Sequence, residues 1–337
     1  MMNKRVRILS ACALALAVTI SGLTLPGAYA ANAVDTGKTD CSIEFNLSKN
    51  VYGSGENATD FAELSTLPIQ VKLYKVATIT ETGAYNAVTG FEELNLDSIS
   101  NETSAADWEE KAVKAKEVIE KNTTSPTATA VLNGGTGKAE GLATGMYLIV
   151  PQEVQSPYYT YSFKENLISL PNNYYYTSGS DAWVYKLTGT NAVGLKPDRQ
   201  ERKGSLEIIK TLESYNETSG GATFVFNVEV KKLDGTVTNN VYKIAFDGKG
   251  SSSRVIENLP AGATVTVTEV YSGANYSLTS ANYQKTVIIA DETVSVSFTN
   301  AHNGGQNCGS GIENHFYNNE GTTDWNNDLV AEGGAEK

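Results

Sequence analysis

Several short runs between residues 204 and 300 alternate apolar and polar residues with a period of two, and this pattern constrains the fold more than any other feature of the sequence. The alternating runs predict strands at about 205–212, 222–231, 241–246, 263–271 and 285–299. Turn residues such as Asp234-Gly235 separate these runs. Short strands at this spacing, without a helical pattern, predict an all-β sandwich over 204–301.

In three of the predicted strands, a polar residue follows the apolar residues of the same parity. Successive side chains of a strand point to opposite faces, so residues two positions apart share a face. By this rule Lys210, Glu269 and Asn300 lie on the inward faces of three separate strands. The apolar residues of the same parity are Leu206 and Ile208, Val265 and Val267, and Val294, Val296 and Phe298. Burial of a lone charged group is costly, so these side chains are expected to pair or to react.

A reaction among the three is chemically reasonable. Desolvation lowers the pKa of a lysine and raises that of a glutamate, so burial favours a neutral amine beside a protonated acid. Lys210 would then attack the side-chain carbonyl of Asn300, Glu269 would polarise that carbonyl and transfer the proton, and ammonia would leave. The product is an internal isopeptide bond that forms once per molecule. The alternative from parity alone is a buried Lys210–Glu269 ion pair with Asn300 as a hydrogen-bond partner.

Five motifs follow one another in this part of the chain: GSLEIIK at 204–210, FVF at 224–226, LPAGA at 259–263, TVTE at 266–269 and FTN at 298–300. They resemble successive strands of the Cna B-type (SpaA-like), isopeptide-forming domains of Gram-positive pilins and adhesins. The resemblance implies an immunoglobulin-like sandwich. It also implies that Lys210 and Asn300 form the bond and that Glu269 catalyses its formation.

The segment 31–200 is predicted to be a second β-sandwich into which one helix is inserted, so that the chain is all-β with two sandwiches in tandem. The helix is expected at about 105–121, with Ser104 as its N-cap and Asp107 three residues later. The apolar residues Trp108, Ala112, Ala115 and Ile119 recur at helical spacing and are expected to pack on the sandwich. The polar segment 196–204 is the best linker candidate.

This first domain resembles the N-terminal domain of Gram-positive pilin subunits more loosely, through VKLYKV at 71–76, GL at 141–142, GMYLI at 145–149 and WVY at 183–185. Lys75 matches the lysine of that motif, but Pro151 stands where the acid should follow, so a crosslink at Lys75 is a weak candidate. Lys196 lies between the domains, where such pilins often carry the lysine that a sortase uses. A plain linker lysine is the alternative.

The N-terminus has the layout of a secretory signal over residues 1–30: a basic start, an apolar run from 11 to 20, and the cleavage site Ala28-Tyr29-Ala30. A secreted protein at the bacterial surface or in a fimbria is therefore expected. No other stretch approaches the roughly 20 apolar residues of a spanning helix, so no transmembrane anchor is expected. Cys41 and Cys308 can pair within one molecule, join two subunits or remain unpaired.

Residues 302–337 are predicted to be a polar tail, rich in Gly and Asn. They lack the LPxTG-like motif, apolar helix and basic end of covalently assembled pilins. We therefore expect either retention by non-covalent or disulfide contacts, or a role outside a pilus shaft. The net charge of -12 argues against a nucleic-acid partner. No motif indicates a cofactor, a metal site or an enzyme with turnover.

These features predict a structural pilin-like subunit or adhesin, with other pilin subunits or cell-surface proteins as partners. The alternative is a secreted module that binds carbohydrate or a host protein through the tyrosines clustered at 158–161 and 174–176. Alternating strand tyrosines are as often half-buried sheet residues, so both interpretations of the tyrosines stay open.

Overall fold

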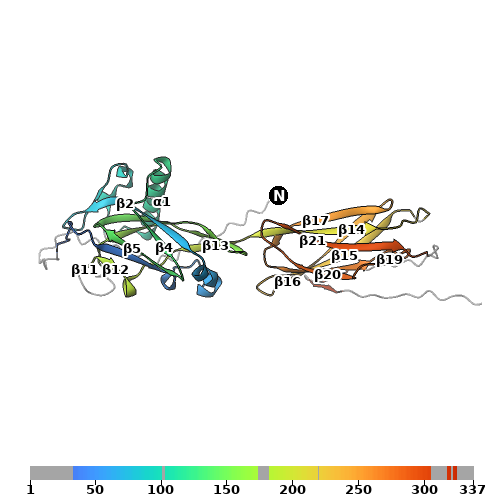
Figure 1. Cartoon of the computed structure of the whole chain (residues 1–337). Coiled ribbons are helices and arrows are strands. Elements are labelled where there is room, and N and C mark those ends of the chain that lie inside the picture. The colour runs from blue at the N-terminus through green and yellow to red at the C-terminus, as the bar shows by residue number, and fades with distance from the viewer. Residues whose placement is uncertain are drawn as a thin grey trace, which may run out of the picture. The chain divides into compact units, whose positions relative to one another are not determined.

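The structure is a computed structural model that describes residues 33–100, 103–173, 182–218, 220–304, 317–319 and 322–324. The chain divides into two compact units, residues 1–202 and residues 203–337 (Figure 1). Most of the described elements are strands, and the single α-helix among the described residues belongs to the first unit. The predicted fold class, all-β with one inserted helix, is confirmed. The predicted signal segment lies outside the described residues.

The described part of the first unit contains three small sheets and a two-stranded pair. One sheet has the strand order β12-β1-β5, and a second has the order β3-β2-β6-β9 with β4 also paired to β2. A third has the order β13-β8-β7, and β10 pairs with β11. The strands are β1 (Cys41–Asn46), β2 (Ile69–Ile79), β3 (Tyr85–Ala87), β4 (Ala128–Leu132), β5 (Thr136–Leu142), β6 (Gly145–Pro151), β7 (Val154–Gln155), β8 (Tyr159–Phe163), β9 (Asn166–Leu170), β10 (Asn172–Asn173), β11 (Trp183–Val184), β12 (Lys186–Leu187) and β13 (Pro197–Glu201).

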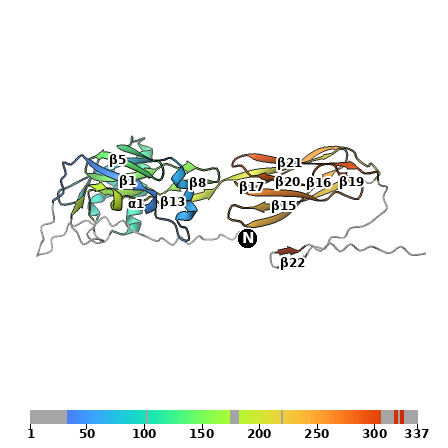
Figure 2. The same ribbon diagram turned by 60° about the horizontal axis from the view of Figure 1, so that its bottom comes forward.

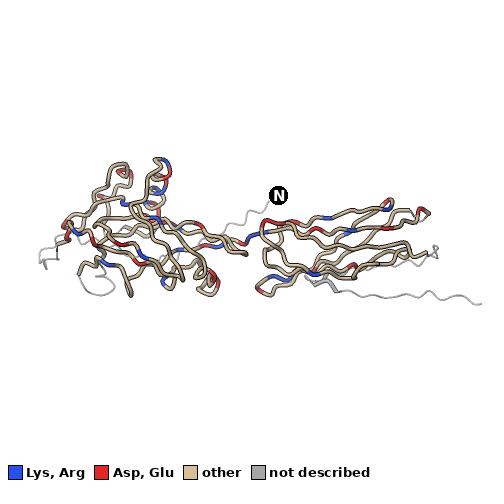
Figure 3. Tube along the Cα trace, in the orientation of Figure 1, with Lys and Arg blue, Asp and Glu red and all other residues tan. Residues whose placement is uncertain are grey.

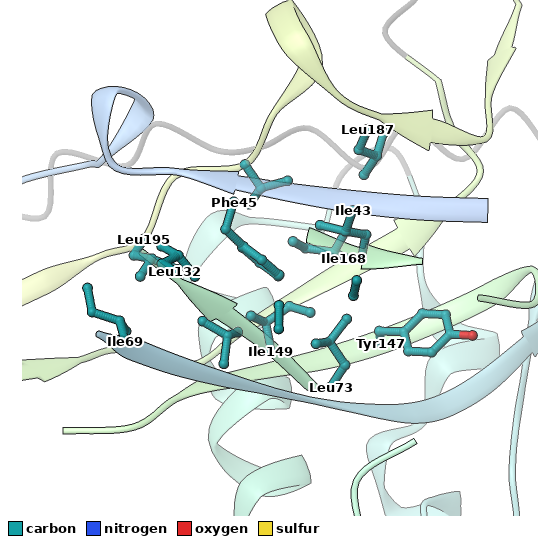
Figure 4. Close-up of a cluster of buried hydrophobic side chains, with 14 of the residues drawn as sticks. Ile43, Phe45, Ile69, Leu73, Leu132, Tyr147, Ile149, Ile168, Leu187 and Leu195 are labelled. Carbon is teal, nitrogen blue, oxygen red and sulfur yellow. The ribbon is translucent and has the colours of Figure 1, made fainter. Parts of the chain in front are cut away.

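The main core of the first unit lies between its first two sheets. Ile43 and Phe45 of β1 point toward Leu73 of β2 and Ile149 of β6, and all four are buried (Figure 4). Short 3-10 helices connect the strands: η1 (Leu47–Lys49), η2 (Ala58–Thr66), η3 (Glu92–Leu94), η4 (Leu96–Ser98) and η5 (Gly189–Asn191). This arrangement is a sandwich whose inner faces supply the apolar residues of alternating parity.

Helix α1 (Ala105–Lys121) covers the other face of the β3-β2-β6-β9 sheet. It begins with the expected capping box, in which the Ser104 side chain accepts from the Asp107 amide and the Asp107 carboxylate accepts from the Ser104 amide. The residues Ala112, Ala115 and Ile119 are buried, and Trp108 packs beside them. Because helix and sandwich cover both faces of β6, every residue of that strand is buried, which explains its continuous apolar sequence.

The boundary between the two units, at residues 202 and 203, falls inside the segment 196–204 that was the best linker candidate, but most of this segment is strand rather than loop. Strand β13 pairs in antiparallel fashion with β8 along its whole length, and β14 begins at Lys203, two residues after β13 ends. Arg199 explains why a polar sequence packs here. Its guanidinium donates to the Asp60 carbonyl oxygen at 2.6 Å and to the Asp60 carboxylate at 3.0 Å. It also lies over the rings of Phe61 and Tyr159, at 5.5 and 5.1 Å from their centroids.

The second unit is a sandwich of two four-stranded sheets, with the orders β17-β14-β21-β19 and β16-β15-β18-β20. Figure 2 shows β17 and β21 of the first of these sheets and β15, β16 and β20 of the second. The strands are β14 (Lys203–Leu212), β15 (Ala222–Lys231), β16 (Val237–Phe246), β17 (Gly250–Pro260), β18 (Thr264–Tyr271), β19 (Tyr276–Leu278), β20 (Tyr283–Val287) and β21 (Thr293–His302). The first strand, β14, and the last, β21, are parallel neighbours.

Two details of the second unit differ from the sequence prediction. The single strand expected at 285–299 is two strands, β20 and β21, separated by a turn in which Asp291 has a positive φ of 61°. Strands β17 and β19 were not predicted. Strand β17 is an edge strand whose side chains are mostly exposed, so its sequence GSSSRVIENLP lacks the apolar alternation of a half-buried strand.

Little of the predicted tail is described. Strand β21 continues to His302, one residue into the segment expected to be tail. Two short strands, β22 (Tyr317–Asn319) and β23 (Thr322–Asp324), pair in antiparallel fashion. Among the described residues, no helix combines the length and the apolar character needed to span a bilayer.

Candidate isopeptide site in the second unit

Strand geometry brings Lys210, Glu269 and Asn300 together inside the second sandwich. Lys210 lies on β14 and Asn300 on the parallel neighbour β21, two residues beyond the partner of Lys210 in the register. Glu269 lies on β18, in the opposite sheet. All three side chains point inward, because they continue the buried positions of their strands. Lys210 and Asn300 are fully buried, and the Glu269 side chain is 1% exposed.

The three side chains form a closed ring of contacts. The Lys210 amine Nζ donates to Glu269 Oε2 at 2.6 Å and is in direct contact with Asn300 Oδ1. The Asn300 amide nitrogen Nδ2 donates to the second carboxylate oxygen, Glu269 Oε1, at 2.7 Å. One carboxyl group therefore bridges the amine and the amide nitrogen. A buried Lys210–Glu269 ion pair with Asn300 as hydrogen-bond partner has the same contacts. The contacts alone are therefore compatible with an ion pair and with a site that forms an isopeptide bond.

Aromatic rings enclose the amine and make its surroundings apolar. Lys210 Nζ lies 4.4 Å from the ring centroid of Phe224 and 5.9 Å from that of Phe226. The Phe226 ring in turn packs on Phe298, with 5.1 Å between centroids. Burial lowers the pKa of Lys210, although the Glu269 carboxylate opposes this shift. Sequence reasoning did not assign Phe224 and Phe226 to the site, although their inward parity on β15 was an available signal.

This arrangement can support amide exchange with all atoms accounted for. A bond forms between Lys210 Nζ and the side-chain carbonyl carbon of Asn300, and the bond from that carbon to Nδ2 breaks. Glu269 can accept the proton that the amine loses and deliver it to Nδ2, because one of its oxygens contacts each nitrogen. Nδ2 then leaves as ammonia. No other side chain is needed for the step.

The lowered pKa of Lys210 predicts a pH effect in an Asn300→Ala variant, where the amine cannot be acylated and stays titratable. Between that lowered pKa and the ordinary value of 10.5, the folded state binds fewer protons than the unfolded state. The free energy of unfolding should therefore rise with pH over this range. Denaturant unfolding at several pH values would measure the slope, with the unsubstituted protein as reference. A flat or falling difference between the two proteins would contradict the prediction.

Lys75 in the first unit has no comparable partners. It is half-buried on β2, and burial lowers the pKa of its amine. In the described part of the chain no acidic side chain pairs with it, and Pro151 pairs with Val71 rather than with Lys75. Its side chain lies on Gly145, where an added Cβ would come within 2.6 Å of the Lys75 Cε. A crosslink at Lys75 stays a prediction.

The other candidate residues are placed separately. The Lys196 amine pairs with Glu109 of helix α1 at 3.1 Å, on the first unit. Cys41 is buried on β1, and burial raises the pKa of its thiol. Cys308, its candidate partner, lies outside the described residues, so the three alternatives of an internal disulfide, a disulfide between subunits and unpaired thiols stay open. Among the described residues no group of His, Cys, Asp and Glu is arranged to hold a metal ion.

The tyrosines of the first unit are mainly packing residues where they are described. Tyr161 is fully buried and donates to Glu63 at 3.0 Å, and Tyr159 packs against the core and against Arg199. The second cluster, at 174–176, lies outside the described residues. The half-buried sheet interpretation therefore accounts for Tyr159 and Tyr161.

Comparison with known proteins gives one family match and a group of similar structures. Residues 206–303, which include Lys210, Glu269 and Asn300, match a family described as "Domain of unknown function (DUF5979)". No curated protein sequence matches this chain significantly.

The similar solved structures include pilins of Gram-positive bacteria. GBS52, the minor pilin of Streptococcus agalactiae, is 12% identical with a TM-score of 0.25, over 80% of this chain and 99% of GBS52. The shaft pilin SpaA of Lactobacillus rhamnosus GG is 12% identical with a TM-score of 0.27, over 80% of this chain and 100% of SpaA. The major pilin T-13 of Streptococcus pyogenes is 12% identical with a TM-score of 0.22, over 81% of this chain and 100% of T-13. These are similarities at low identity, and they assign no role to any residue of this chain.

Proposed function

We propose that this chain is a structural, pilin-like subunit or adhesin of the bacterial cell surface, and that an intramolecular Lys210–Asn300 isopeptide bond closes its second domain. Glu269 catalyses this bond in a single autocatalytic turnover, and the protein has no other enzymatic activity. The signal-like N-terminus supports an extracellular location, and the motifs over 204–300 support the pilin-like role. Its partners are other pilin subunits or cell-surface proteins.

The observation that carries the proposal is the contact between the Lys210 amine and the Asn300 carboxamide in a buried site. A buried amine with a lowered pKa is a better nucleophile, because less of it is protonated. The Glu269 carboxyl touches both the amine and the leaving nitrogen, which is the position that a proton carrier requires.

The bond would have a mechanical use. It joins the first strand of the domain to the last, across 90 residues of sequence. Tension applied at the two ends of the domain would then pass from β14 to β21 through the bond, and residues 211–299 would carry none of it. A protein that is pulled at the cell surface gains more from this than from equilibrium stability, since its lifetime depends on the rate of unfolding.

Intact mass tests the proposal. The purified chain should be lighter than its calculated mass by one ammonia, and a digest should contain one branched peptide that joins the segments around Lys210 and Asn300. Lys210→Met should restore the calculated mass, whereas Lys249→Met, at an exposed turn, should keep the deficit. A chain of the calculated mass, with no branched peptide, would leave the buried ion pair as the correct description.

A further inference from the structure

Exposed apolar side chains gather on one outer face of the second unit. This face belongs to the β16-β15-β18-β20 sheet. Along each strand, every second side chain points into the core, and the side chains between them point outward and form the face. Gln284 confirms the orientation of β20, since its side chain reaches across the sandwich to the Ser297 carbonyl oxygen of β21. The large apolar residues exposed on this outer face are Val237, Val241, Tyr271, Tyr283 and Val287. Tyr283 is 59% exposed, Val241 44% and Tyr271 38%.

The strand register places these residues side by side. One row across the four strands consists of Val241, Asn227, Thr268 and Tyr283, each directly opposite the next. Neighbouring strands lie about 4.8 Å apart, so this row is about 14 Å long. It contains no charged residue. Tyr271 lies opposite Val225, beside the same row. The exposed Tyr271 and Tyr283 rings therefore share this face with the half-buried side chains of Asn227 and Thr268.

The opposite outer face of the same sandwich is chemically different. Its outward residues are mostly hydroxyl-bearing, namely Ser205, Thr211, Ser251, Ser253, Thr293, Ser295 and Ser297. Val255 is the one large apolar residue that is exposed on the described strands of that sheet. Both faces belong to the same fold and both meet solvent, so the fold does not require the apolar character of the first face. Apolar residues gathered on one face are typical of a contact surface.

The charged residues on the apolar face indicate which sign of charge a binding partner carries. Lys231, Lys243 and Lys285 point outward there, with Glu229 as the acidic residue among them. None of the three lysines forms an ion pair in the described part of the chain. Elsewhere on the second unit, basic and acidic residues are interspersed (Figure 3). In a chain of net charge -12, a face with three unpaired lysines favours an acidic partner.

We infer that this face binds an extended polysaccharide that carries uronic-acid carboxylates. The Tyr271 and Tyr283 rings supply flat, rigid apolar area for sugar rings, and the Thr268 hydroxyl beside Tyr283 in the register supplies a hydrogen-bonding group for a sugar hydroxyl. Lys285, two residues from Tyr283 on the same strand, can pair with a carboxylate beside a stacked ring. A carboxylated glycan uses the aromatic, polar and basic groups of this face together.

The experiment uses the full chain and hyaluronan, a polysaccharide with a uronic acid in each repeat, with neutral dextran as reference. Calorimetric titration should show saturable binding of hyaluronan and none of dextran. Tyr283→Ala and Lys285→Gln should each weaken binding about tenfold. Two matched pairs of variants test whether binding occurs on this face: Val241→Ser with Val255→Ser, and Lys285→Gln with Lys249→Gln. Val241→Ser should weaken binding and Val255→Ser should not, and Lys249→Gln should behave as the unsubstituted protein.

Several results would overturn the inference. These are no saturable binding of hyaluronan, equal binding of dextran, equal losses in the Val255→Ser and Lys249→Gln controls, or binding that Tyr283→Ala leaves unchanged. A dimer in light scattering that Val241→Ser dissociates would assign the face to a second copy of the chain instead. None of these variants touches Lys210, Glu269 or Asn300, so the mass deficit should persist in all of them. Failure of glycan binding is therefore distinguishable from failure of the isopeptide bond.

Discussion

Lys210→Met is expected to lower the free energy of unfolding of the second domain by roughly 4 to 5 kcal/mol, because it removes a crosslink between residues 90 apart in sequence. A covalent bond of this span restricts the unfolded chain, and the restriction grows with the logarithm of the loop length. Methionine has a side chain of similar length and carries no charge, so the variant tests the crosslink with little change in core volume. For a domain of this size the melting temperature should fall on the order of 20 °C.

Thermal and denaturant unfolding of the full chain would measure this loss in the transition of the second domain. Lys249→Met, which changes an exposed turn lysine, should leave the transition unchanged. The unfolding rate and the resistance to proteolysis should change in the same direction, since the bond prevents separation of β14 from β21. An equally stable Lys210→Met protein would show that no crosslink stabilises the domain.

Glu269→Gln is expected to destabilise the domain further than Lys210→Met. The glutamine cannot carry a proton from the amine to the leaving nitrogen, so the bond should not form and the calculated mass should return. In addition, the Lys210 amine would remain buried without its carboxylate partner at 2.6 Å. Removal of one partner from a buried ion pair costs about 3 to 5 kcal/mol. Lys210→Met also removes one partner, but the Glu269 carboxyl that it leaves keeps the Asn300 amide as a hydrogen-bond donor, whereas the amine in Glu269→Gln keeps only neutral acceptors.

The order of stability of the three proteins therefore distinguishes the role of Glu269 as proton carrier from its role as the carboxylate partner of Lys210. The unsubstituted protein should be the most stable, Lys210→Met should follow, and Glu269→Gln should be the least stable. Glu257→Gln, on the exposed edge strand β17, is the matched control and should keep both the mass deficit and the stability. A Glu269→Gln protein that still lacks one ammonia would mean that the amine and the amide react without this carboxyl.

Much of the candidate site could be predicted from parity. Lys210, Glu269 and Asn300 each continue an alternating apolar strand, and strand geometry requires such residues to face inward. Helix α1 could also be predicted from the sequence, because its capping residues and its apolar stripe are local features. The contacts among the three side chains could not be predicted from the sequence, since they depend on which strands are neighbours within a sheet and which face each other across the two sheets.

Strands β13 and β17 were missed for one reason. Both lie at sheet edges, where an exposed polar side chain is tolerated, so their sequences look like a linker and a loop. In β13, Arg199 completes a strand by stacking on Phe61 and Tyr159, and these residues are far from it in sequence. Local alternation cannot reveal a contact of that kind.

The sequence by itself determined the all-β class, the inserted helix and the inward direction of Lys210, Glu269 and Asn300, because each follows from a period of two or of 3.6 residues. Only the tertiary structure decided that the Glu269 carboxyl bridges the amine and the amide, and that Phe224 and Phe226 enclose the amine. It also decided that Val241 and Tyr283 lie in one row with Asn227 and Thr268. Periodicity is a property of one strand, whereas the pairing of strands and the packing of sheets are properties of the whole fold.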